Sequence, residues 1–336
     1  MGDDGAPRRA RYLFWVILGA LSTAIPEVIA GSDLYPFFKV TDYLLVIPLY
    51  TLHSLVLWYV VWRGGRPRLY SLFPAGALFG LYETYMTKVI WDPTWAAAPF
   101  RVFGVAVVET LVLVMFWHSF LAFIVPLFIA ETSLTCSREI AGGLPAWASG
   151  RLARLQERCL FLVFPFVGGL FQSVNVHSLR DAVFSGLTST VVIVGLVYVW
   201  RRLYGRRHSL RGLLPTRNEF RVLLALLLLL YGLMGVFWRP EALPGLGPQL
   251  AVWALYLFFG GLLYLGLRKS RVDESGSPVT EPNTSLGRMM LFGAVFSLGS
   301  LLGEATGLSF VAVYVVWILG IVFGFIVLVY TVRSVL

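Results

Sequence analysis

Charged residues are scarce in this chain. Only 13% of its 336 residues are Asp, Glu, Lys or Arg, whereas 58% are hydrophobic. A soluble globular domain carries about 25% charged residues, so this composition excludes an ordinary soluble protein. The chain also lacks a long polar stretch that could form a separate soluble domain. The composition therefore indicates an integral membrane protein.

Motifs that signal well-defined chemistries are missing as well. The sequence contains no HExxH, GxSxG or Walker A motif. Its two cysteines, Cys136 and Cys159, fall in or beside one predicted cytoplasmic loop, where a disulfide is not expected. Two cysteines without a nearby histidine do not form a zinc site. We therefore expect no cofactor, assign no catalytic residue and leave any metal unspecified.

Long apolar runs are what the chain has in abundance. Runs of about 18 or more apolar residues recur from end to end, as membrane-spanning helices require. Trp and Tyr cluster near the ends of these runs, which is typical of interfacial anchors. The sequence predicts an all-α, polytopic integral membrane protein in which residues 1–336 form a single transmembrane helical domain. The ten predicted helices cover residues 12–31, 42–62, 69–91, 100–130, 160–176, 182–200, 222–238, 249–267, 288–307 and 309–332.

The distribution of basic residues orients these helices. With the N-terminus inside, 22 Lys and Arg residues lie in or beside inside segments and only four lie in outside loops. Both termini are therefore predicted to be cytoplasmic, and the protein is expected in the cell membrane. Residues 132–159 and 201–221 form predicted basic cytoplasmic loops, and residues 268–288 form a flexible cytoplasmic loop. A cleaved signal peptide is the alternative for the first helix.

The net charge of +9 fits this topology, and we do not expect a nucleic-acid partner. Besides the lipid bilayer, anionic lipid headgroups are candidate partners for the arginine-rich loop 201–221, although simple cytoplasmic anchoring also explains those charges. Small residues at GxxxG spacing favour close helix packing and offer faces for a homo-oligomer. They are Gly76 with Gly80, Gly299 with Gly303 and Gly307, and Gly320 with Gly324.

Four glutamates lie inside or at the edge of predicted helices, all in the predicted outer half of the membrane. A carboxylate there is costly unless it is paired, protonated or in contact with water, so each marks a candidate site. Glu83 and Glu109 each lie about 12 Å below the outer end of consecutive helices. We expect them to face each other and to share a proton or a cation. The four glutamates are Glu27, Glu83, Glu109 and Glu304.

Each glutamate also has a structural alternative. Glu83 continues the small-residue face of Gly76 and Gly80, so it should point into the helix bundle, where it could instead bond to a backbone group. Glu109 has apolar neighbours along its face. Glu27 is equally well explained as an interfacial residue, and Glu304 lies on a stripe of small residues that more often indicates tight packing.

Two basic side chains complete the predicted site. His53 lies near mid-membrane and could relay protons, although a structural hydrogen bond explains it as well. Lys88 is expected to extend to the outer interface or to serve as the counter-charge of Glu83 or Glu109. The sequence places His118 deep toward the inside and out of reach of Glu109.

Three functions fit these observations. The favoured one is a transporter or permease whose outward-facing acidic site binds a proton, a small cation or an organic amine. The alternative is an intramembrane enzyme, a glutamate-dependent hydrolase or protease acting on a lipid or a membrane peptide, assisted by His53 or His177. A histidine within about 4 Å of Glu83 or Glu109 around a wet pocket would favour this enzyme. The third is a helical scaffold or assembly protein.

Overall fold

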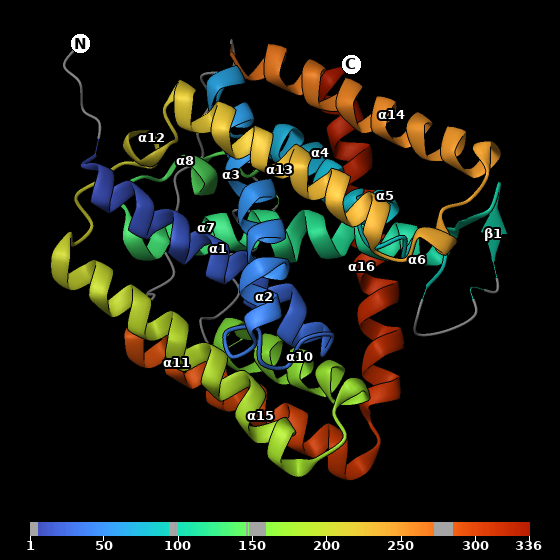
Figure 1. The fold of residues 1–336 in the computed structure, drawn as a ribbon. Coiled ribbons are helices and arrows are strands. Elements are labelled where there is room, and N and C mark those ends of the chain that lie inside the picture. The colour runs from blue at the N-terminus through green and yellow to red at the C-terminus, as the bar shows by residue number, and fades with distance from the viewer. Residues whose placement is uncertain (1–5, 94–97, 99, 146, 148–158, 272–284) are drawn as a thin grey trace. The chain divides into compact units, whose positions relative to one another are not determined.

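Helices make up most of the part of the chain that the structure describes. The computed structural model describes residues 6–93, 98, 100–145, 147, 159–271 and 285–336 (Figure 1). Within these residues, eight helices are long and apolar enough to cross a membrane. The prediction of a helical, multi-pass membrane protein is therefore confirmed. Most of the predicted loop 268–288 and part of the loop 132–159 lie outside the described residues.

Ten spans stay a prediction, because two of the predicted segments form shorter helices. Residues 69–91 contain α4 (Leu69–Gly80), and residues 160–176 contain the apolar stretch Phe161–Asn175. At 12 residues, α4 is about 18 Å long, whereas the hydrocarbon core of a bilayer is about 30 Å thick. The eight long helices cover Arg8–Ala30, Val40–Gly64, Val107–Leu134, Leu179–Leu203, Arg217–Phe237, Leu246–Ser270, Leu286–Thr306 and Ser309–Val335.

The chain divides into two compact units. The first comprises Met1–Thr51, Pro126–Leu214 and Gly276–Ile318, and the second comprises Leu52–Val125, Pro215–Ser275 and Leu319–Leu336. Among the described helices, α3 (Val46–Gly64) and α16 (Ser309–Val335) have several residues in each unit, and α7 (Val125–Leu134) has its first residue, Val125, in the second. The first unit holds α1 (Arg8–Ala30), α2 (Val40–Leu44), most of α7 (Val125–Leu134), α8 (Glu139–Gly142), η2 (Cys159–Val163), α10 (Phe164–Gln172), η3 (Ser173–Asn175), α11 (Leu179–Leu203), α12 (Leu210–Leu213) and α15 (Leu286–Thr306).

The second unit contains the remaining elements, including a small hairpin and an unusual π-helix. Its members are α4, α5 (Tyr82–Tyr85), β1 (Arg101–Val102), β2 (Val105–Ala106), α6 (Val107–Val112), the π-helix η1 (Leu113–Ile124), α13 (Arg217–Phe237), η4 (Pro240–Ala242) and α14 (Leu246–Ser270). The strands β1 and β2 are antiparallel, with Arg101 opposite Ala106. Two-residue hairpin turns need positive φ angles, and Phe103 and Gly104 supply them at 49° and 77°.

Local sequence sets several helix ends. Thr216 and Glu219 form a capping box at the start of α13. The Ser178 hydroxyl accepts the backbone N–H of Asp181 at the start of α11. At the other end, Gly31 and Gly307 have φ angles of 69° and 72° and terminate α1 and α15. Glycine takes this left-handed conformation without strain.

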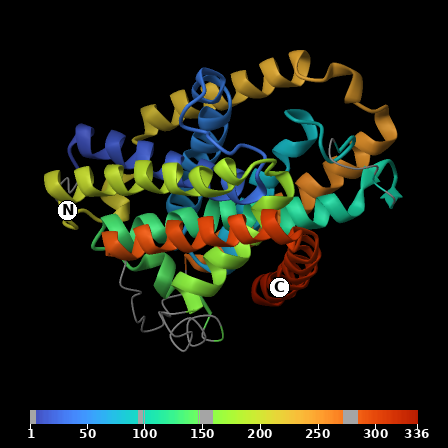
Figure 2. The ribbon, with the colours of Figure 1, turned by 90° about the horizontal axis from the view of Figure 1, so that it is seen from below.

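Small residues bring α10, α11 and α15 together in the first unit. A Cβ on Gly299 would lie 2.2 Å from the carbonyl oxygen of Phe166, and a Cβ on Gly303 would lie 2.0 Å from Ser173 Oγ. The two glycines therefore form the packing face that their spacing predicts. Gly307 does not extend this face, because nothing lies within 4 Å of its Cβ position. Figure 2 shows α11 and α15 running side by side.

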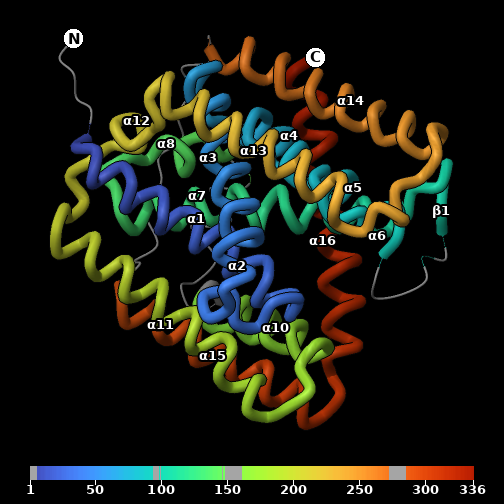
Figure 3. The backbone as a smooth tube through the Cα atoms, viewed as in Figure 1, coloured from blue at the N-terminus to red at the C-terminus, as the bar shows by residue number. Residues whose placement is uncertain are grey.

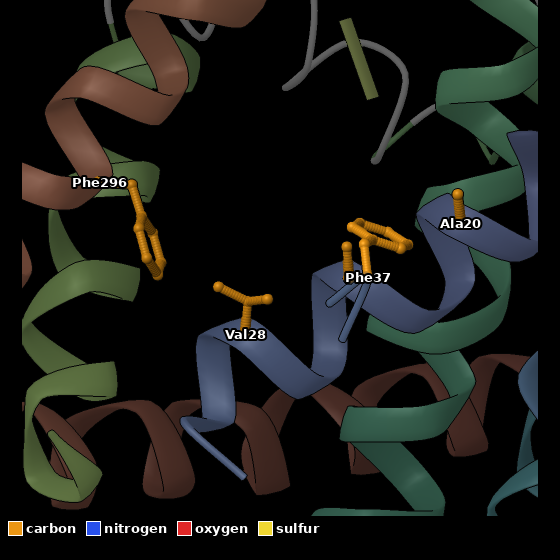
Figure 4. Packing of buried hydrophobic residues seen from close by; sticks show 5 residues of the cluster. Ala20, Val28, Phe37 and Phe296 are labelled. Carbon is orange, nitrogen blue, oxygen red and sulfur yellow. The ribbon is translucent and has the colours of Figure 1, made fainter. Parts of the chain in front are cut away.

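An apolar cluster lies in the interior of the first unit. Val28 of α1 and Phe296 of α15 belong to this cluster, together with Phe37 from the segment between α1 and α2. Figure 4 shows these three side chains pointing into the same space. Burying a large apolar side chain contributes about 1.5–3 kcal/mol, so the cluster stabilises the packing of α1 against the pair α11 and α15.

In the second unit, α4 packs directly against η1. A Cβ on Gly76 would lie 2.6 Å from the Cα atom of Ser119, and a Cβ on Gly80 would lie 2.9 Å from the Cα atom of Val114. The glycines of α16 show the same behaviour, since Gly320 faces the ring of Phe116. The predicted pairs Gly76–Gly80, Gly299–Gly303 and Gly320–Gly324 thus pack against segments of this chain, and a homo-oligomer stays a prediction.

Two predicted helix ranges in the second unit are wrong. Residues 69–91 do not form one helix, because α4 ends at Gly80, α5 covers only Tyr82–Tyr85, and Lys88 has a left-handed φ of 60° that cannot continue a right-handed helix. Residues 100–130 begin with the hairpin, and the helix starts only at Val107. The depths predicted for Glu83 and Lys88 assumed a continuous third helix and therefore do not hold.

Candidate functional site

A carboxyl group and an imidazole meet inside the second unit. The Oε1 atom of Glu83 lies 3.4 Å from the Nε2 atom of His118, and the two side chains are 9% and 2% exposed. Glu83 lies on α5, at the break that follows α4, and His118 lies on η1. The close approach of Gly76 and Gly80 to η1 places these two residues next to each other.

The hydrogen bonds of His118 define its proton positions. Its Nδ1 atom lies 3.0 Å from the carbonyl oxygen of Leu113, which can only accept, so Nδ1 carries a hydrogen. Its Nε2 atom lies 3.0 Å from the hydroxyl of Tyr82 as well as near Glu83. In the neutral ring, Nε2 accepts the hydrogen of Tyr82. In the protonated ring, Nε2 donates and the imidazolium is the counter-charge of Glu83.

The second oxygen of Glu83 is also bonded. Thr87 donates its hydroxyl hydrogen to Oε2. Thr87 is four residues further on and lies beyond the end of α5, so this bond ties the irregular segment to the carboxylate. Glu83 is therefore oriented by two polar groups, and a proton held between Glu83 and His118 has a defined place.

A second set of polar groups lies beside this pair. The Nε2 atom of His53 lies 3.1 Å from the hydroxyl of Tyr231, and the His53 ring stacks on Phe79 with 4.7 Å between ring centroids. The ring centroid of Tyr82 lies 5.5 Å from that of His53. Tyr82 thus contacts the His53 ring with its own ring and the Nε2 atom of His118 with its hydroxyl, and the proton relay through His53 stays a prediction.

Tyr256 forms hydrogen bonds at the interruption between α4 and α5. The hydroxyl of Tyr256 donates to the carbonyl oxygen of Leu81 at 2.8 Å and lies 3.2 Å from the hydroxyl of Thr84. Leu81 is the residue between α4 and α5. The α14 side chain therefore binds a backbone carbonyl at the interruption that carries Glu83.

Glu109 lies in the same unit but has different surroundings. It is only 4% exposed, in the first turn of α6. Its Oε2 atom accepts no hydrogen bond from any residue that the structure describes. The predicted sharing of a proton between Glu83 and Glu109 stays a prediction, whereas the structure places His118 beside Glu83.

Lys88 binds backbone oxygens. Its Nζ atom donates to the carbonyl oxygens of Met234 at 2.8 Å and Gly235 at 3.1 Å, and also to that of Trp238. These carbonyls belong to the C-terminal end of α13, where a cation is stabilised by the helix dipole and by unpaired oxygens. Lys88 is fully buried, so it fixes the irregular segment to α13.

The other two predicted glutamates belong to the first unit. Glu27 accepts hydrogen bonds from the hydroxyl of Tyr50 at Oε1 and from that of Ser32 at Oε2, both at 2.5 Å. Glu304 is partly exposed near the end of α15. Neither contributes to the cluster around Glu83 within the second unit.

The sequence analysis missed some important residues. The proximity of His118 to Glu83 was not predicted, and Tyr82, Tyr231 and Tyr256 were not considered, because aromatic residues are common near helix ends. Glu131 was also missed. Its carboxylate accepts the backbone N–H groups of Ile140 at 3.0 Å and Ala141 at 3.1 Å, and it therefore caps α8.

Metal binding finds no support in the described part of the chain. Among those residues, no group of three or more His, Cys, Asp or Glu side chains is arranged to hold a metal ion. The Glu83–His118 pair offers one carboxylate and one imidazole. Such a pair can hold and pass a proton, and it lies where two helical elements depart from regular α-helix.

Comparisons with known proteins give the chain a family. An uncharacterized protein of Archaeoglobus fulgidus is 30% identical over 288 residues, which cover 84% of this chain and 85% of that protein. No solved structure matches the chain. A family described as an uncharacterized membrane protein family matches residues 16–336. The chain therefore belongs to this membrane protein family.

Proposed function

We propose that this protein is a transporter in which the Glu83–His118 pair takes up a proton and couples its movement to that of a small cation. The single observation that carries the proposal is the 3.4 Å approach of Glu83 Oε1 to His118 Nε2 inside an apolar unit. A buried carboxyl and imidazole at this distance can share one proton, and losing that proton changes the charge of the interior.

The local backbone supports a transport role. Transporters often place their binding sites where membrane helices are interrupted. Glu83 follows the break between α4 and α5, and His118 lies in a π-helix, a conformation that is frequent at functional sites. The bonds from His118 Nδ1 to Leu113 and from Ser119 Oγ to the carbonyl of Val114 satisfy backbone oxygens of η1.

Reconstituted vesicles test this function. The purified protein is placed in vesicles loaded with a pH-sensitive dye, and sodium, potassium or methylammonium chloride is added outside. The wild type should move protons in response to at least one of these cations, and Glu83→Gln should abolish the response. Glu241→Gln, at an exposed position in η4, is the matched control. An unchanged response in Glu83→Gln would reject the proposal.

One observation favours a second function. His118 meets the distance expected for an intramembrane hydrolase, because it lies 3.4 Å from Glu83 and the pair could act as general base and acid. The substrate would be a phospholipid or a membrane peptide. Incubation with fluorescent phospholipids and a labelled transmembrane peptide distinguishes the two functions. Product formation that Glu83→Gln abolishes would favour the enzyme over the transporter.

A further inference from the structure

Glu109 is a buried carboxylate for which the described part of the chain provides no partner. It is 4% exposed, its Oε2 atom accepts no hydrogen bond, and no described side chain forms an ion pair with it. An acidic side chain in this state is costly, since burial without a counter-charge removes its hydration. A residue kept at such a cost in a membrane helix points to a ligand.

An orphaned donor lies in the neighbouring segment. Trp91 is 3% exposed, and its Nε1 atom has no hydrogen-bond partner among the described residues. A backbone hydrogen bond joins the two segments that carry these residues. The N–H of Ala106 donates to the carbonyl of Ile90 at 3.0 Å, and Ala106 lies one helical turn before Thr110, whose hydroxyl donates to the Ala106 carbonyl.

The basic side chains of this region are engaged elsewhere. Lys88 binds the carbonyls at the end of α13. Arg101 donates to the carbonyl of Trp91, and Arg239 pairs with Asp92. None of the three neutralises Glu109. Because the described residues provide no counter-charge for Glu109, an external cation would supply it.

Aromatic rings lie in the segment that precedes the hairpin. Tyr85 packs edge-on against Trp91 with 5.0 Å between ring centroids, and Trp253 of α14 donates its indole N–H to the Tyr85 hydroxyl at 2.5 Å. Figure 3 shows α5, α6 and the β1–β2 hairpin in one region of the second unit, and Gly104 of this hairpin touches Pro248 of α14. Organic ammonium groups bind to aromatic faces beside a carboxylate.

We propose that Glu109 is the binding carboxylate for a small organic amine, whose ammonium group it pairs with beside the rings of Tyr85 and Trp91. This inference rests on the proposed transport function and names its substrate class. A metal ion fits less well, because it needs several carboxylate or imidazole ligands, and the described residues provide no such group. Proton uptake at Glu83 and amine binding at Glu109 would then be separate events.

Thermal unfolding of the detergent-purified protein tests the proposal without requiring transport. Methylammonium or tetramethylammonium chloride should raise the Tm in a saturable way, because a ligand that binds the folded state stabilises it. Sodium chloride at the same ionic strength should not. Glu109→Gln should raise the half-saturating amine concentration by at least about tenfold. Glu241→Gln, at an exposed position in η4, should behave as the wild type.

The ligand-free Tm separates binding from structure. If Glu109 is kept for binding, Glu109→Gln should leave the ligand-free Tm unchanged or raise it, since the variant removes a buried, unpaired charge. Glu109→Asp keeps the charge and should retain weaker amine binding. The proposal would be overturned if the wild type had the same Tm in amine chloride and in sodium chloride. It would also be overturned if amine raised the Tm of Glu109→Gln as much, and at the same concentrations, as that of the wild type.

The two proposals can fail separately. Proton movement driven by sodium or potassium in vesicles, without an amine effect on Tm, would remove the amine site and leave the transporter. Saturable amine binding that needs Glu109, with no proton movement in vesicles, would keep the site and reject coupled transport.

Discussion

Tyr82 and Glu83 approach the same nitrogen of His118, with the Tyr82 hydroxyl at 3.0 Å and the Glu83 carboxylate at 3.4 Å from Nε2. One nitrogen atom can bond strongly to only one of them at a time, as acceptor from tyrosine or as donor to the carboxylate. The protonation of His118 therefore selects its partner. This choice gives the second unit two hydrogen-bonded states without a change of fold.

The Glu83–His118 pair should show energetic coupling. Glu83→Ala leaves a buried imidazole without its carboxylate and is expected to destabilise the protein by about 3 kcal/mol. Glu83→Ala with His118→Ala should cost less than the sum of the single variants, with a coupling of about 0.5–3 kcal/mol. Denaturation in mixed detergent measures the free energy of unfolding of the wild type, the two single variants and the double variant. Strict additivity would show that the pair does not interact.

The contact between α4 and η1 should not tolerate a methyl group. In Gly76→Ala the new Cβ would lie 2.6 Å from backbone of Ser119, so one helix must move, at about 1–3 kcal/mol. Gly260→Ala in α14 is the matched control, because nothing lies within 4 Å of its Cβ position. It should be neutral or stabilising by up to about 1 kcal/mol. Thermal melts that rank the two variants in the reverse order would contradict this packing.

Lys88 should contribute more to stability than a surface lysine. Lys88→Met leaves buried carbonyl oxygens at the end of α13 without a donor, which costs about 1–3 kcal/mol. Lys269→Met removes an exposed lysine that donates to the carbonyl of Ser334, and should stay within about 0.5 kcal/mol of the wild type. A fall in Tm that is equal for both variants would argue against this role of Lys88.

Tyr35 should make stability depend on pH in the alkaline range. Burial, together with its hydrogen bond to Asp181, raises the pKa of Tyr35 from 10.0 to about 12. Because the folded pKa lies above the unfolded one, the contribution is complete below pH 10 and is lost as the pH rises from 10 through about 12. Tyr35→Phe should remove this part of the pH dependence. Melting curves between pH 8 and 11 check it, and identical slopes for both proteins would refute it.

Local sequence was sufficient for much of the fold. The apolar runs predict the eight long helices because a membrane-spanning helix satisfies its own backbone hydrogen bonds and needs only apolar side chains over about 20 residues. The Gly76–Gly80 spacing also places Glu83 on a face directed at another helix, because small residues mark close contacts. Where the backbone left the regular helix, at Lys88 and at Phe103, this reasoning was wrong.

The sequence by itself determined that this is a helical membrane protein with rare carboxylates in apolar surroundings, since composition and periodicity are local properties. Only the tertiary structure decided that Glu83 meets His118 and that no described residue forms a hydrogen bond to the Oε2 atom of Glu109. The physical reason is that η1 has wider turns than an α-helix, which changes the side chains that share a face. Long-range contacts between α4 and η1 then determine which side chains meet, and these contacts cannot be deduced from the periodicity of residues along the chain.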